Sequence, residues 1–171
     1  GTYILSTQQL LLSHGFCHLN CTIYSKLFFT EITGLDENYR YEPDRDIFIR
    51  AIDQAKLIVH NPNNIGIHYI PDKEKKLNIS TSLSDLDKYL YQLRTFDKGI
   101  LFSKQQIIKD YCKLQKLYTL KNISTKLYND DNFNTSYIYG KQALSIKLTF
   151  KWAVFTILIF IKSILKNKHV T

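Results

Sequence analysis

Residues 54–71 read QAKLIVHNPNNIGIHYIP, and this stretch decides the fold expected for the chain. In residues 55–60, Leu57 and Val59 share one face of an extended chain with β-branched residues at its centre. An Asn-Pro-Asn-Asn run then provides the backbone conformations of a turn, and residues 65–70 resume an extended pattern. The stretch therefore predicts two strands joined by a turn.

A third strand is expected to cover this hairpin. Residues 77–83, LNISTSL, carry apolar side chains at alternate positions together with β-prone threonine. An isolated two-stranded hairpin is only marginally stable in water. We therefore expect Leu57 and Val59 to be buried against one face of residues 77–83.

Other segments have helical periodicity. Residues 84–93 and 103–120 both place apolar side chains at helical spacing, and Ser103 is the expected N-cap of the second helix. A helix that faces the core is favoured for residues 103–120, and a helix that binds a membrane surface or a partner is the alternative. Residues 122–140 are rich in Asn, Asp, Ser and Thr, which predicts a loop or linker.

The most hydrophobic segment is residues 144–165, LSIKLTFKWAVFTILIFIKSIL. Its 22 residues suffice to cross a bilayer core about 30 Å thick at about 1.5 Å per residue. Its lysines, Lys147, Lys151 and Lys162, lie nearer the ends than the centre, where such side chains can reach the headgroups. The segment predicts a transmembrane helix followed by a cytoplasmic tail at residues 166–171, and a buried helix of a soluble domain is the alternative.

Four Asn-x-Ser/Thr sequons precede the hydrophobic segment, and none follows it. Sequons become glycosylated when they face the lumen of the secretory pathway. Residues 1–140 are therefore expected to form an extracellular domain. The candidate glycosylation sites are Asn20, Asn78, Asn122 and Asn134.

The net charge of +8 suits an anionic partner, but the lysines are spread singly and no nucleic-acid-binding signature accompanies them. A solvated surface explains them, and we expect no nucleic-acid partner. No phosphate-binding loop, zinc-protease motif or nucleophile elbow occurs, so we expect neither an enzyme nor a cofactor. The cysteines are odd in number, which leaves their pairing open, and they lack the further ligands of a zinc site: Cys17, Cys21 and Cys112.

A family resemblance rests on three short elements in order along the chain. Residues 58–63, IVHNPN, resemble the (V/I)-H-(D/N)-P element of the degenerin/epithelial sodium channel family, which includes acid-sensing and pickpocket channels. Upstream, residues 15–20, GFCHLN, resemble the G-x-C-Y-T-F-N element of that family, one residue short. Downstream, Leu93-Arg94 resembles the end of a further segment. The matched motif residues are Gly15, Cys17, Asn20, His60, Asn61 and Pro62.

The resemblance implies an α+β fold, with a β-rich extracellular domain of palm-like and ball-like strands, peripheral helices and a C-terminal hydrophobic helix. It also implies a homo- or hetero-trimeric subunit of an amiloride-sensitive-type channel that passes sodium ions across the plasma membrane. The Gly-x-Ser filter of the family is absent from residues 144–165, so this chain is not expected to conduct by itself. The alternatives are a single-pass membrane or secreted interaction protein without channel activity, and a basic soluble domain that binds acidic partners.

Overall fold

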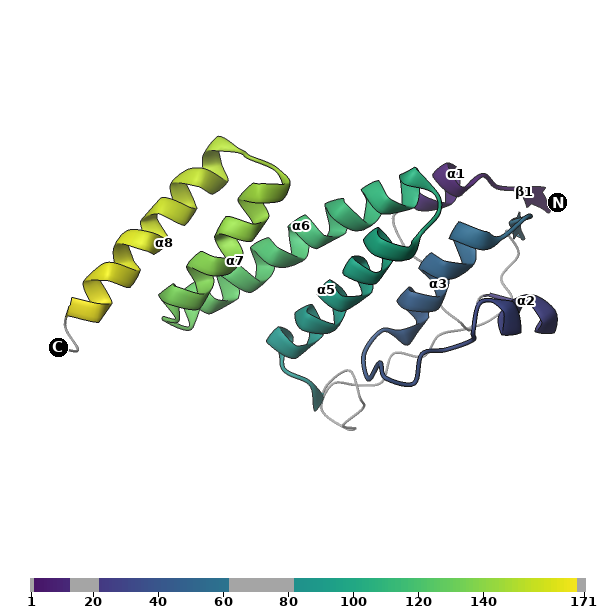
Figure 1. Ribbon diagram of the computed structural model, residues 1–171, viewed down its shortest axis with the longest axis horizontal. Coiled ribbons are helices and arrows are strands. Elements are labelled where there is room, and N and C mark those ends of the chain that lie inside the picture. The colour runs from purple at the N-terminus through teal and green to yellow at the C-terminus, as the bar shows by residue number, and fades with distance from the viewer. Residues whose placement is uncertain (1, 13–21, 62–81, 169–171) are drawn as a thin grey trace.

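The computed structural model describes residues 2–12, 22–61 and 82–168 (Figure 1). The structure is 72% helical. The N-terminal part contains β1 (Tyr3–Ile4), α1 (Thr7–Leu12), α2 (Lys26–Glu31), α3 (Pro43–Gln54) and β2 (Val59–His60). The remainder consists of four helices, α5 (Asp85–Phe102), α6 (Gln106–Asn129), α7 (Phe133–Ile146) and α8 (Phe150–Lys168).

Helices that follow one another in the sequence pack side by side. Figure 1 shows α5 against the first half of α6, and α7 against its second half. Helix α3 lies on α5, and α8 lies on α7 at the far end of the row. Helix α6 therefore joins two packed groups, and α8 is the outermost helix of the second group.

Polar side chains define where the helices begin. Ser84 caps α5 by accepting a hydrogen bond from the backbone N–H of Asp87 (3.1 Å). Asp53, at the end of α3, accepts hydrogen bonds from the backbone N–H groups of Lys104 and Gln105 at 2.8–3.0 Å, just before α6 begins. One buried carboxylate thus ties the end of α3 to the joint between α5 and α6.

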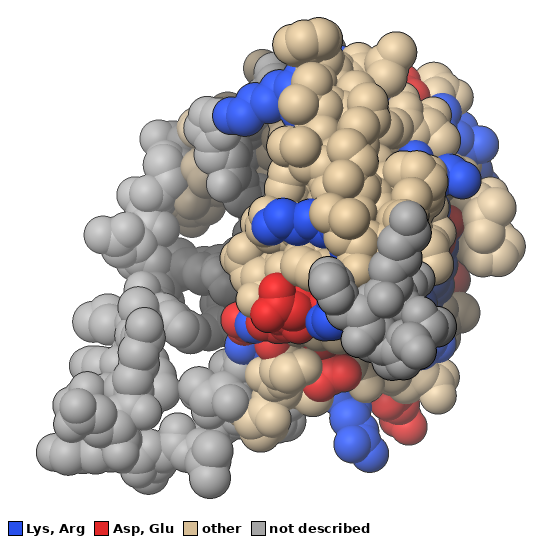
Figure 2. Space-filling model, turned by 90° about the vertical axis from the view of Figure 1, so that its left-hand side faces the viewer, with Lys and Arg blue, Asp and Glu red and all other residues tan. Residues whose placement is uncertain are grey.

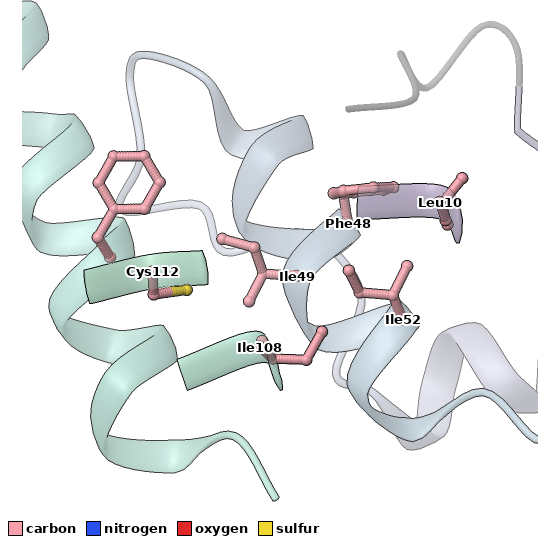
Figure 3. Close-up of a cluster of buried hydrophobic side chains, with 7 residues drawn as sticks. Leu10, Phe48, Ile49, Ile52, Ile108 and Cys112 are labelled. Carbon is pink, nitrogen blue, oxygen red and sulfur yellow. The ribbon is translucent and has the colours of Figure 1, made fainter. Parts of the chain in front are cut away.

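The first packed group has an ordinary apolar core (Figure 3). Its side chains come from α1, α3, α5 and α6, and α5 and α6 approach closely at Gly99. A Cβ atom added there would lie 2.4 Å from Sγ of Cys112. The buried cluster consists of Leu10, Phe48, Ile49, Ile52, Phe96, Ile108 and Cys112.

The predicted β-rich α+β fold is wrong. In the described residues the only sheet is the antiparallel pair β1–β2, with Tyr3 opposite His60 and Ile4 opposite Val59. The core position that the predicted hairpin was to fill is occupied by α3, whose apolar side chains reach both the α1–α5–α6 cluster and α2. Tertiary packing of α3 therefore outweighs the local strand propensity that follows it.

The predicted burial of Leu57 and Val59 is also wrong, because their side chains are 60% and 57% exposed. Only the last two residues of the predicted strand 55–60 belong to β2. The predicted second strand, residues 65–70, lies outside the described residues, as do residues 77–81 of the third.

The predicted helices at residues 84–93 and 103–120 are confirmed in α5 and α6, and both extend further along the chain. Ser103 is the C-cap of α5 and not the N-cap of α6. The predicted loop at residues 122–140 is wrong, because α6 and α7 occupy most of it. Its polar residues cap and join these helices: Asn132 is the N-cap of α7, and Ser124 and Ser136 hydrogen-bond to each other's carbonyl oxygens.

The transmembrane helix predicted at residues 144–165 is not a continuous helix. Lys147 is the C-cap of α7, with an extended backbone, and α8 starts at Phe150. Among the helices that the structure describes, none has the length and apolar character needed to cross a membrane. The lysines at both sides of this break lower the hydrophobicity of the segment, and the break shortens the helix that remains.

Candidate binding surface on helix α8

Two contacts fix α8 against α7. The indole Nε1 of Trp152 donates a hydrogen bond to the carbonyl oxygen of Gly140 (3.2 Å). The absence of a side chain at Gly140 lets Thr156 approach, since an added Cβ would lie 3.2 Å from its Oγ1 and 3.3 Å from Oγ of Ser124. These contacts determine which side of α8 faces the protein.

The inner side of α8 buries two hydroxyl side chains and one isoleucine. Within residues 150–166, the buried side chains are those of Thr156, Ile159 and Ser163. The two hydroxyls donate to carbonyl oxygens of their own helix, Thr156 to Trp152 (2.8 Å) and Ser163 to Phe160 (2.7 Å). The inner side therefore leaves no hydroxyl without an acceptor.

The outer side of α8 carries large apolar side chains. Six of them follow one another at helical spacing and are between 41% and 57% exposed. Leu148 and Phe150, which are 76% and 87% exposed, continue the apolar surface around the turn between α7 and α8. We call the surface formed by the six the outer face: Val154, Ile157, Leu158, Ile161, Ile164 and Leu165.

Lysines run along one edge of the outer face. Lys151 and Lys162 are about three helical turns apart and Lys166 follows one turn later, so they lie on the same side of α8. We call these three residues the lysine edge. Figure 2, in which the α8 side of the molecule faces the viewer, shows a broad tan area with blue side chains at its margins and red side chains below it.

Aromatic rings orient the end of this lysine edge. Nζ of Lys162 lies 4.5 Å from the ring centroid of Tyr128 and donates to its hydroxyl (2.5 Å). Nζ of Lys166 lies 5.5 Å from the centroid of Phe133 and donates to the carbonyl oxygen of Asp131 (2.7 Å). Beyond Asp131 the sequence contains six lysines and no Asp or Glu.

Two cavities in the described part of the chain offer no comparable arrangement. A cavity of about 120 Å³ between α3 and α5 is bordered by Asp46 and Asp53. Asp46 is paired with Arg50 (2.6 Å) and Lys98 (2.9 Å), while Asp53 accepts the backbone hydrogen bonds described above. A more open cavity of about 310 Å³ lies at the α6–α7 turn, beside Asp131 and Lys166. The carboxylates at the first cavity thus have structural roles.

No group of His, Cys, Asp and Glu side chains in the described part of the chain is arranged to hold a metal ion. The one described cysteine, Cys112, is a free thiol buried between α3, α5 and α6. Burial, with a smaller contribution from the charge of Asp53, raises the pKa of this thiol to about 12. At neutral pH Cys112 is therefore a protonated core residue.

The residues predicted from the resemblance and the sequons are not brought together. His60 lies in β2 with its ring 5.1 Å from that of Tyr3, and Asn61 follows it. Asn122 and Asn134 are exposed on α6 and α7, although Ser124, which belongs to the sequon of Asn122, is fully buried. The other predicted residues lie outside the described residues: Gly15, Cys17, Asn20, Cys21, Pro62 and Asn78.

Sequence reasoning does not identify the outer face, because residues 144–165 taken together predict a membrane span. The signal was present in the sequence, since the six apolar residues recur at helical spacing while Thr156 and Ser163 fall on the opposite side. Comparison with family models, with curated proteins and with solved structures finds no match for this chain.

Proposed function

We propose that this protein is a non-enzymatic membrane-binding protein that attaches to a bilayer surface through the outer face of α8. The observation that carries the proposal is the apolar surface of α8, where the six large side chains of the outer face remain 41–57% exposed. Contiguous exposed apolar surface marks a site of interaction with a partner or a membrane. An interfacial helix lies in the membrane plane and does not need the length of a span.

The contacts between α6, α7 and α8 support the same proposal. Where helices pack against each other in an apolar medium, small residues and internally satisfied hydroxyls are the favoured contacts. Gly140, Ser124 and Ser136 provide such contacts between α6, α7 and α8. Helices α7 and α8 can therefore contact hydrocarbon without leaving these inner hydroxyls unpaired.

The outer face supplies part of the free energy of attachment. Transfer of one such side chain from water contributes about 1.5–3 kcal/mol when it is fully exposed beforehand. The six side chains are about half exposed, so their transfer contributes roughly 5–9 kcal/mol before the cost of ordering is subtracted. A single myristoyl chain contributes at least as much and binds membranes only marginally, so attachment also needs the electrostatic attraction of the lysine edge.

A bilayer fits this surface better than a second copy of the chain. In a symmetric dimer that pairs the outer faces, each copy places its own lysine edge at the same interface. The sequence beyond Asp131 contains no carboxylate with which the opposing copy could compensate that charge. A membrane with anionic lipids supplies the missing negative charge.

Flotation of the full chain with lipid vesicles tests this function. The variant carries Ile157→Asn, Leu158→Asn and Ile161→Asn, and the control carries Leu101→Asn, which changes a leucine that is 70% exposed on α5. We expect wild type and control to float and the triple variant to remain at the bottom, with unchanged helical circular dichroism in all three. Flotation of the triple variant like wild type, or concentration-dependent dimers of wild type that never float, would overturn the proposal.

The sodium channel subunit stays a prediction that rests on the sequence resemblance. The resemblance implied a β-rich domain, whereas the described residues are mainly helical. Trimer assembly, sodium transport and location in the plasma membrane belong to the same prediction. Because no observation on the described residues favours them, we do not propose them as a second function.

A further inference from the structure

We infer that α8 binds anionic lipid headgroups selectively, through the lysine edge, while the outer face enters the bilayer. This inference rests on the proposed function and adds the class of lipid. Its starting point is the placement of Lys151, Lys162 and Lys166 along the border of the apolar surface. An interfacial helix places this border at the level of the headgroups.

The position of the lysine edge lets its charges and the apolar side chains act together. Lys162 lies one turn from both Leu158 and Leu165, so its side chain can reach phosphate oxygens while these leucines contact acyl chains. A lysine on the opposite side of the helix would face the protein. All three lysines of the edge are exposed.

The surroundings of the lysine edge determine the sign of the charge that it presents. Tyr128 and Phe133 hold the ammonium group of Lys162 through ring faces and a hydroxyl, which leaves its positive charge unneutralised. Lys166 donates to a backbone carbonyl oxygen, which is also uncharged. The nearby carboxylate of Asp130 is paired with Lys126 (3.0 Å), and the exposed carboxylate of Asp131 offsets at most one of the three lysine charges. The α8 surface thus has a local excess of positive charge and suits anionic headgroups.

The test compares binding to vesicles of phosphatidylcholine alone with binding to vesicles that contain phosphatidylglycerol as about a third of the lipid. One variant carries Lys151→Gln, Lys162→Gln and Lys166→Gln. The matched control carries Lys56→Gln, Lys104→Gln and Lys113→Gln, which change the net charge equally at exposed positions away from α8. Helical circular dichroism of each variant verifies that it is folded.

We expect wild type and control to bind the anionic vesicles on the order of 100-fold more tightly than the neutral ones. Loss of the lysine edge is expected to weaken binding to anionic vesicles by on the order of 100-fold, and to leave binding to neutral vesicles unchanged. Equal binding of wild type to both vesicles, or equal weakening by the control variant, would refute the lipid selectivity while leaving the proposed function intact. A wild-type protein that binds neither vesicle would refute both.

Discussion

The contact between Gly99 and Cys112 sets the distance between α5 and α6. No side chain larger than hydrogen fits at position 99, because the space that a Cβ would occupy is filled by the sulfur of Cys112 at 2.4 Å. Both residues are buried, and a Cβ added at Gly99 would also lie 3.4 Å from Cγ2 of Ile49 in α3. A change at either residue therefore affects the packing of three helices.

Gly99→Ala is expected to lower the free energy of unfolding by about 1–3 kcal/mol, because the core has no room for the added methyl group. Cys112→Ala removes the sulfur, so the double variant is expected to be more stable than the sum of the two single effects by about 0.5–3 kcal/mol. Urea unfolding followed by circular dichroism measures this coupling. Strictly additive effects would show that α5 and α6 do not meet at these residues.

At the scale of elements, the joint between α5 and α6 depends on a residue of α3. The carboxylate of Asp53 is 8% exposed and accepts hydrogen bonds from two successive backbone N–H groups ahead of α6. It thereby satisfies donors that would otherwise be left unpaired at the start of the helix.

Asp53→Ala is expected to reduce the free energy of unfolding by about 1–3 kcal/mol, because two partly buried backbone hydrogen bonds lose their charged acceptor. Asp53→Asn retains one acceptor oxygen and is expected to have a smaller effect. Thermal unfolding of the three proteins gives the order. Equal stability of Asp53→Ala and wild type would contradict the role of this carboxylate.

Sequence patterns predict helices correctly where the apolar spacing is regular. They fail where packing against other parts of the chain determines the secondary structure. The periodicity of residues 84–93 and 103–120 was sufficient to predict parts of α5 and α6. Residues 55–60 have strand propensity, but the core beside them is occupied by α3, which leaves Leu57 exposed. The start of α3 had local signals, namely Pro43 followed by Asp44 and Asp46 in the first turn.

The candidate surface was only partly accessible to sequence reasoning, for a related reason. Average hydrophobicity identified residues 144–165 as exceptional, but it does not register which side of a helix an apolar residue occupies. The hydroxyls of Thr156 and Ser163 indicate the inner side only once Gly140 of α7 is known to contact Trp152 and Thr156 of α8. That orientation is also needed to place the lysine edge at the border of the outer face.

For the molecule as a whole, the row of helices has two ends with opposite characters (Figure 1). The end formed by α1, α3, α5 and α6 contains the largest buried apolar cluster, although Leu101 and Phe102 at the end of α5 are 70% and 75% exposed. The end formed by α7 and α8 buries Ile159 and the hydroxyls of Thr156 and Ser163, and leaves six large apolar side chains exposed on the outer face. The outer face of α8, and not its inner side, is therefore expected to contact lipid.

Fluorescence quenching by lipids with brominated acyl chains tests this claim most directly. The chain has one tryptophan, Trp152, which lies on the inner side of α8 and packs beside Leu117 and Ala143. A second protein carries Trp152→Phe and Ile157→Trp, which moves the indole to the outer face. With anionic vesicles, we expect strong quenching and a blue shift for the indole at position 157, and weak quenching for wild type. Quenching at position 157 that does not exceed that of Trp152, with no blue shift, would contradict the account.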